Sequence, residues 1–340
     1  MKKTILFIAW SMLILGGVIS IYFIFTAYAD GYWIWGDKVE YDTTGQFGDF
    51  FGGVIGTFFA LAGTLLLVLT FQEQSKQNKR ESFETKFYEM LHLHKQNVEE
   101  IQVGEKRGRE ARGREAIELL FYNLRDIYMI VENAVSEIER INPSTDDKEE
   151  VKRFDRMKNF LSKPNNKLNF IHNLSYGYFF YGVQNYYVTK NKQDVQYDIN
   201  VDVTAILVVN KTSKSLFSPR NSLLGHYFRH LYQTVQFIAR EENLQEDEKY
   251  NYAKMVRAQL SDFEQALLYY NSLSVMGKKW ITPIGIVDIK KMCLIARFRL
   301  IKNMPYYFEY FGIKPGDFFE VEKEVWQTHG GNFFEIDLIN

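Results

Sequence analysis

The sequence has almost no cysteine, little proline and almost no net charge. Among 340 residues it has one cysteine, Cys293, which excludes an intramolecular disulfide and a cysteine metal cluster and fits a reducing compartment. Six prolines are spread along the chain, which favours long helices. The formal net charge is −1, so no overall field attracts nucleic acid or an acidic partner. Composition alone therefore assigns no class of function.

Short motifs with a known catalytic mechanism are absent as well. The sequence has no phosphate-binding Walker loop, no dinucleotide-binding glycine fingerprint, no G-x-S-x-G elbow and no H-E-x-x-H zinc motif. We therefore expect neither a metal nor an organic cofactor. Cys293 lies among apolar neighbours, and we interpret it as a small buried hydrophobic residue.

Two long apolar runs without charge lie near the N-terminus, at residues 5–25 and 50–71. As a helix, the first run would span roughly 31 Å, about the hydrocarbon thickness of a bilayer. A cleaved signal peptide is the alternative for this run, because Ala27-Tyr28-Ala29 resembles a cleavage site. Signal peptides have shorter apolar regions, however. We interpret both runs as transmembrane helices that form a hairpin over 1–72, with an outward loop at 26–46.

The charges that flank the two runs predict the orientation of the hairpin. Lys2 and Lys3 precede the first run and three basic residues closely follow the second, whereas the loop at 26–46 carries four acidic residues and one lysine. Flanks rich in Lys and Arg stay in the cytoplasm. We therefore predict a multi-pass membrane protein with both termini in the cytoplasm.

Small residues recur every four positions along the second run. They are Gly48, Gly52, Gly56, Ala60 and Thr64. Small side chains let helices approach closely in lipid, where packing has no hydrophobic driving force. This small-residue stripe either packs against the first helix of the same chain, where Gly16, Gly17 and Ser20 offer a matching face, or forms a seam between chains. We expect the bilayer and a second copy of the chain as partners.

The remaining chain, 73–340, predicts a mainly α-helical cytoplasmic domain. We expect a stalk helix at 73–103, a basic loop at 104–114, a helical bundle at 115–311 and an irregular tail at 312–340. The fold class is thus an N-terminal transmembrane hairpin followed by a helical bundle.

Within the bundle, three segments carry more specific predictions. Residues 193–216 break the helical rhythm, and a β-prone patch there predicts a small strand or extended insertion. Ser218 and Pro219 should begin the next helix, as N-cap and first-turn residues. One continuous helix is then expected over 246–273.

One spacing resembles a nuclease motif. Arg220 and His226 match the R-x4–6-H pattern of HEPN-type ribonucleases, and the polar Asn221 follows the arginine. The resemblance implies that His226 is a general acid–base at a ribose 2′-OH while Arg220 stabilises phosphate charge, with RNA as a partner. The alternative is a structural polar network in the bundle. Its candidates are Arg229, His230, Arg257 and Asp262.

Four longer phrases point to a family. They are FGDFFGGVIGTFFALAGTLLLVLTFQEQ, FETKFYEMLHLHKQNV, LGHYFRHLYQTV and RAQLSDFEQALLYYN. Together they resemble the AbiC-like phage abortive infection family of bacterial membrane proteins. The resemblance implies antiviral defence in the bacterial inner membrane, in which an infected cell is halted or killed before phage matures. It supplies no catalytic residues.

Three hypotheses follow for the mechanism. The first is a membrane-disrupting effector whose cytoplasmic domain senses an unknown phage-derived trigger. The second is a membrane-tethered ribonuclease that uses Arg220 and His226. The third is a non-enzymatic membrane scaffold or sensor whose partner acts on the cell.

Overall fold

The computed structural model describes residues 2–31, 41–106, 109–141, 147–183, 194–209, 215–283, 288–305 and 308–335. The chain divides into two compact units, Met1–Lys86 and Phe87–Asn340, which are described in turn. The predicted boundary at 72/73, between the transmembrane hairpin and the cytoplasmic domain, stays a prediction.

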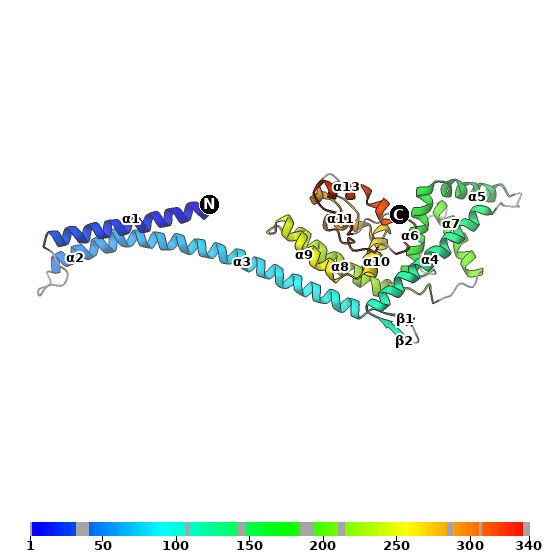
Figure 1. Ribbon diagram of the computed structural model, residues 1–340, viewed down its shortest axis with the longest axis horizontal. Helices are drawn as coiled ribbons and strands as arrows, with labels where there is room; N and C mark the ends of the chain where they lie inside the picture. The colour runs from blue at the N-terminus through cyan, green and yellow to red at the C-terminus, as the bar shows by residue number, and fades with distance from the viewer. Residues whose placement is uncertain are drawn as a thin grey trace. The chain divides into compact units, whose positions relative to one another are not determined.

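The first unit contains two antiparallel helical segments that lie side by side (Figure 1). One is α1 (Lys2–Ala29). The other begins with α2 (Tyr41–Phe50), passes through a π-helical turn, η1 (Phe51–Ile55), and continues into α3 (Gly56–Glu99), whose C-terminal part belongs to the second unit. Both segments are long and apolar enough to cross a membrane by length and composition. The two predicted apolar helices are therefore present.

The second unit begins with the end of α3 and a two-stranded antiparallel sheet, β1 (Gln102–Lys106) and β2 (Arg109–Arg112). The prediction of a loop at 104–114 is wrong for these residues. The backbone N–H and C=O groups of the two strands pair with each other here, with a bulge at Gly104. The side chain of Ala111 is buried and anchors one strand. The small β element of this fold is thus a hairpin in the segment that was expected to be a basic loop.

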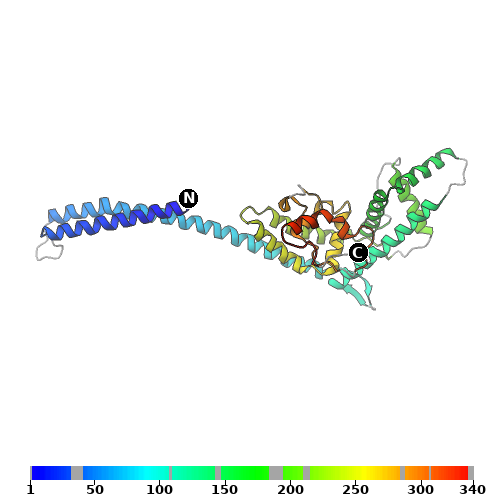
Figure 2. The same cartoon turned by 45° about the horizontal axis from the view of Figure 1, so that its top comes forward.

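Four helices follow, and both views show them close together (Figure 2). They are α4 (Arg114–Arg140), α5 (Lys148–Leu161), α6 (Pro164–Tyr181) and α7 (Val195–Val209). α4 packs against α6 and α7, and α5 packs against the same two helices. An apolar stripe at helical spacing, from Ile117 to Ile138, is buried along α4, which is the pattern of an amphipathic helix facing a core.

The β-prone insertion predicted at 193–216 is wrong for residues 195–209, which form the helix α7, while residues 193 and 210–214 lie outside the described part of the chain. Ile199, Val203 and Leu207 recur every four residues and are buried on one side of this helix. Asp202 on the same helix forms an ion pair with Arg153 of α5, at 2.6 Å. β-branched residues favour strands only weakly, and a buried face with helical spacing outweighs that preference.

Three helices form the next part of the second unit: α8 (Asn221–Arg240), α9 (Glu246–Gln259) and α10 (Asp262–Leu273). The single helix predicted over 246–273 is therefore wrong. Ser261 caps α10 in a capping box with Glu264, which begins a new helix after Leu260. The predicted N-cap of α8 is also wrong, because Arg220 and not Ser218 occupies that position.

The C-terminal part contains short helices: η2 (Lys278–Trp280), η3 (Ile289–Lys291), α11 (Leu294–Phe298), α12 (Pro315–Phe318) and α13 (Glu320–Thr328). The tail predicted to be irregular thus contains α12 and α13. Phe319, Phe333 and Phe334 are buried in it. Apolar anchors of this kind keep a terminal segment folded against the domain.

Aromatic side chains hold this tail and α4 against α10. Tyr270 stacks on Phe311 with ring centroids 4.1 Å apart. The Tyr270 hydroxyl accepts a hydrogen bond from the Phe311 backbone N–H at 2.9 Å and donates one to its carbonyl at 3.2 Å. Phe121 of α4 contacts both rings and also Phe263 and Phe308. Stacking and satisfied hydroxyl groups together make this the aromatic core of the second unit.

A buried histidine in this core predicts acid sensitivity. His172 of α6 donates from Nε2 to the Tyr270 carbonyl at 3.0 Å, and burial lowers its pKa from about 6.5 to about 4. Below pH 6.5 the unfolded chain binds a proton there that the folded chain does not bind until about pH 4. His172 should therefore remove roughly 3 kcal/mol of folding free energy as the pH falls through this range.

Urea unfolding of the detergent-solubilised chain at several pH values, followed by near-ultraviolet circular dichroism, would measure this loss. We expect His172→Gln to flatten the pH dependence, whatever its effect on stability at pH 7. The control is His92→Gln, at an exposed position of α3, which should keep the full dependence. An equally steep acid loss in His172→Gln would contradict the prediction.

Candidate functional site

The small-residue stripe lies away from the contact between α1 and the second helical segment. The buried side of that contact recurs at seven-residue spacing instead: Ala9, Gly16, Ile55, Ala62 and Leu69. A Cβ at Gly16 would lie 3.2 Å from Phe58 Cβ, so the backbones are closely packed there. Gly48, Gly52, Ala60 and Thr64 are exposed, whereas Gly56 is half-buried. A Cβ at Gly48 or Gly52 would meet nothing within 4 Å. Packing within the chain therefore uses a different face of the second segment from the small-residue stripe.

A π-helical turn, η1, lies within the segment that carries the stripe. In η1 the Gly56 N–H bonds to the Phe51 carbonyl, five residues back, so the turn contains one residue more than an α-helical turn.

Arg220, the first nuclease candidate, is buried at the start of α8, with 4 % of its surface exposed. Its guanidinium donates to the carbonyls of Phe179 at 3.2 Å, Ser218 at 3.0 Å and Leu216 at 3.0 Å. It also lies 4.9 Å from the centre of the Phe179 ring. Burial lowers its pKa to about 10, which leaves it cationic at neutral pH. These contacts join the end of α6 to the start of α8 and leave the guanidinium turned away from solvent.

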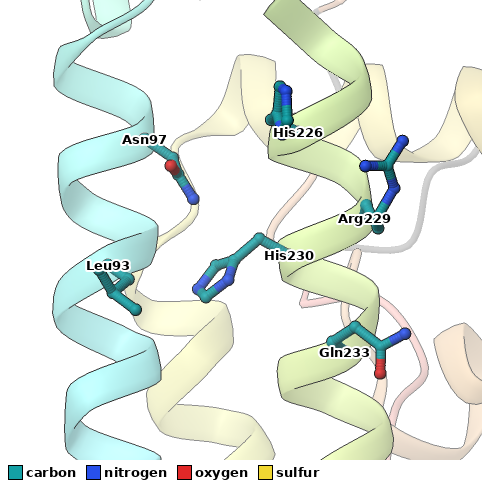
Figure 3. A pocket seen from close by; sticks show the side chains of 6 residues that line it. All are labelled: Leu93, Asn97, His226, Arg229, His230 and Gln233. Carbon is teal, nitrogen blue, oxygen red and sulfur yellow. The ribbon is translucent and has the colours of Figure 1, made fainter.

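The other candidates on α8 lie on a different surface. Asn221 and His226 are exposed, while His230 points toward α3 and donates from Nε2 to the Met90 carbonyl at 2.8 Å (Figure 3). His226, Arg229 and His230 line an open pocket of about 320 Å³. The rest of its lining is Leu93, Asn97 and Gln233. Arg220 and His226 therefore do not share one site.

Arg257 and Asp262, the remaining network candidates, are on α9 and α10. Arg257 is buried and donates to the carbonyls of Arg299 at 3.0 Å and Phe298 at 3.5 Å. Its guanidinium also lies 6.0 Å from the Tyr250 ring centre. Asp262 is half-buried in the first turn of α10. The described contacts of Arg257 thus hold the chain around α11 and do not reach α10.

A buried polar cluster brings together four elements of the second unit. Glu264 of α10 is 1 % exposed, and its carboxylate accepts hydrogen bonds from the Ser261 N–H at 2.8 Å and the Tyr227 hydroxyl at 3.1 Å. His94 of α3 lies with Nε2 3.7 Å from this carboxylate, and Arg114 of α4 lies with Nε 3.9 Å from it. An acid, an imidazole, a phenol and a guanidinium thus meet in one place.

Burial controls the charges of this cluster. Burial raises the pKa of Glu264. Burial, together with the nearby His230 and Arg114, lowers the pKa of His94 to about 4. Burial also raises the pKa of Tyr227 well above its usual value. At neutral pH, His94 is therefore an uncharged imidazole beside a buried acid, an arrangement that allows proton exchange between the two groups.

The segment from α8 to α11 contains most of these side chains. Residues 220–309 match the family model described as "Putative phage abortive infection protein". The family resemblance is thereby confirmed for this segment, which includes the third and fourth phrases, whereas the first two lie outside it. No protein among the curated ones and no solved structure matches the chain.

In this phage abortive infection segment, the sequence contained one signal for the buried cluster that our predictions missed. Ser261 and Glu264 form the S-x-x-E pattern of a capping box, which predicts a helix start and places Glu264 in its first turn. His94 and Arg114 come from outside the matched segment, from α3 and α4. No sequence pattern links residues so far apart in the chain. Among the described residues, no group of three or more His, Cys, Asp or Glu side chains is placed to hold a metal ion.

Proposed function

We propose that this protein is a membrane effector of phage abortive infection. Its hairpin spans the bacterial inner membrane, chains associate through the exposed small-residue stripe, and a phage-derived trigger sensed by the cytoplasmic unit makes the associated hairpins disrupt the membrane. The exposure of the stripe carries this proposal. Small residues on a lipid-facing surface are typical of contacts between transmembrane helices, and here no helix in the described part of the chain covers Gly48, Gly52, Ala60 or Thr64.

The charges at the open end of the hairpin support the orientation with both termini inside. Lys2 Nζ lies 2.8 Å from Glu73 Oε1, so the basic flank of α1 and the segment after the second apolar run lie at the same end. Lys3, Lys76 and Lys79 are close in sequence to this pair. A cluster of lysines at one end of a hairpin is the pattern that keeps that end in the cytoplasm.

The stripe predicts a specific loss of function. We expect the double variant Gly52→Ile/Ala60→Ile to weaken self-association in bacterial membranes at least about tenfold, since branched side chains would hold the helices apart. Protection against phage and the depolarisation that accompanies infection should be lost with it. Chemical cross-linking in membranes and a potential-sensitive dye would measure the two effects.

The matched control is Gly17→Ile, on α1, where a Cβ also meets nothing within 4 Å but lies off the stripe. It should keep association, depolarisation and protection. Normal protection by the double variant would refute the proposal. Protection without any depolarisation in the wild type would instead indicate a scaffold whose partner acts on the cell.

A further inference from the structure

A cavity of about 290 Å³ opens beside the buried polar cluster, where the end of α3 meets the start of α4 and the end of α9. Its lining is His94, Lys95, Val98, Glu99, Gly113, Arg114 and Gln259. Pockets for organic ligands are generally about 300–1,000 Å³. This cavity therefore suits a small molecule, of mononucleotide size or below.

The N-terminus of α4 forms one wall of the cavity. Gly113 is its N-cap and offers no side chain to the first turn of this 27-residue helix. A helix N-terminus presents backbone N–H groups and a partial positive charge, which favour an anion. Arg114, the first residue of the helix, adds a guanidinium that is 65 % exposed, and Lys95 adds an ammonium group that lies 3.8 Å from the Glu99 carboxylate. These groups can bind the oxygens of a phosphate.

His94 supplies an independent sign of a ligand. It lines this cavity and is 1 % exposed, yet neither of its ring nitrogens has a hydrogen-bond partner in the described part of the chain. Buried polar groups are almost always hydrogen-bonded, because a missing partner is costly. A ligand oxygen at this wall would give the imidazole the partner that the protein does not.

The charges around His94 determine which ligand fits. Glu264 lies 3.7 Å away, the rings of Tyr227 and His230 lie beside it, and Arg114 is nearby. Once protonated, His94 would stand between the Glu264 carboxylate and an anion in the cavity. An anion therefore adds the charge that makes the protonated imidazole stable, so anion binding and proton uptake are coupled.

We propose that this cavity binds the phosphate group of a small molecule, through Arg114, the α4 N-terminus and His94. The site goes beyond the membrane function proposed above, and its test requires neither phage nor a membrane potential. A failure of one proposal is therefore distinguishable from a failure of the other.

Isothermal titration calorimetry on the full chain in detergent tests this site with three probes: adenosine monophosphate, inorganic phosphate and adenosine. We expect saturable binding of the first, at least tenfold weaker binding in Arg114→Gln, and unchanged binding in Arg112→Gln. Arg112→Gln removes the same charge two residues away, from an exposed strand position outside the cavity lining. Equal affinity for inorganic phosphate would identify the free anion as the ligand and also support the site.

The wild-type chain provides a second readout, independent of any variant's folding. Titrations at pH 7.5 in buffers of different ionisation enthalpy should show uptake of up to one proton per ligand. In His94→Gln this uptake should disappear. Adenosine binding as tightly as its monophosphate, binding unchanged in Arg114→Gln, or no saturable binding of either phosphate at millimolar concentration would overturn the proposal.

Discussion

Replacing Gly277 with alanine is expected to destabilise the second unit by about 3 kcal/mol or more, the upper end of the cost of forcing a side chain into a filled space. A Cβ at this position would collide with the backbone carbonyl of Asn271 and lie 2.5 Å from the Asn271 side-chain oxygen. Asn271 cannot move aside easily, because its amide donates to the Tyr176 hydroxyl at 2.7 Å in the aromatic core. The chain after α10 would have to leave its position.

Gly225→Ala is the matched control, in the second turn of α8. A Cβ there would make an ordinary contact with Phe180 at 3.7 Å, and alanine favours helix over glycine by about 1 kcal/mol. We expect this variant to be neutral or slightly stabilised. Hydrogen–deuterium exchange of α8 and α10 in the detergent-solubilised chain would measure both effects. Similar exchange in the Gly277→Ala variant and the wild type would show that this close approach is absent in solution.

Arg220→Met is expected to cost roughly 3 kcal/mol, since it removes the guanidinium donors from one buried and two partly buried carbonyl groups while keeping much of the side-chain length. Protection against phage should fall because the junction of α6 and α8 loosens. Arg229→Met removes an exposed arginine from the same helix and should change stability by less than about 0.5 kcal/mol.

This pair also separates structure from catalysis. A catalytic arginine would leave exchange rates in α6 and α8 unchanged when replaced, and would abolish cleavage of cellular RNA during infection. We expect faster exchange at both helices in Arg220→Met and no RNA cleavage in the wild type. Unchanged exchange, together with cleavage that depends on Arg220 and His226, would revive the ribonuclease hypothesis.

The sequence determined the features that depend on local pattern. Charge-free runs longer than 20 residues specify the two apolar helices. A helix forms the hydrogen bonds of its backbone N–H and C=O groups within one segment, and this is needed where all the side chains are apolar. The stripe from Ile117 to Ile138 specifies α4 through its helical spacing. The family phrases at 224–235 and 257–271 lie within the matched segment 220–309.

The tertiary structure determined the features that depend on contacts between residues far apart in the sequence. Val201 and its β-branched neighbours became part of α7 because burial of Ile199 and Val203 outweighed strand propensity. Arg220 became a structural residue because the carbonyls at the ends of α6 and before α8 surround it. His94, Arg114 and Glu264 lie close together although His94 and Glu264 are 170 positions apart in the sequence. Local sequence patterns do not predict such long-range contacts, since these depend on how the helices pack.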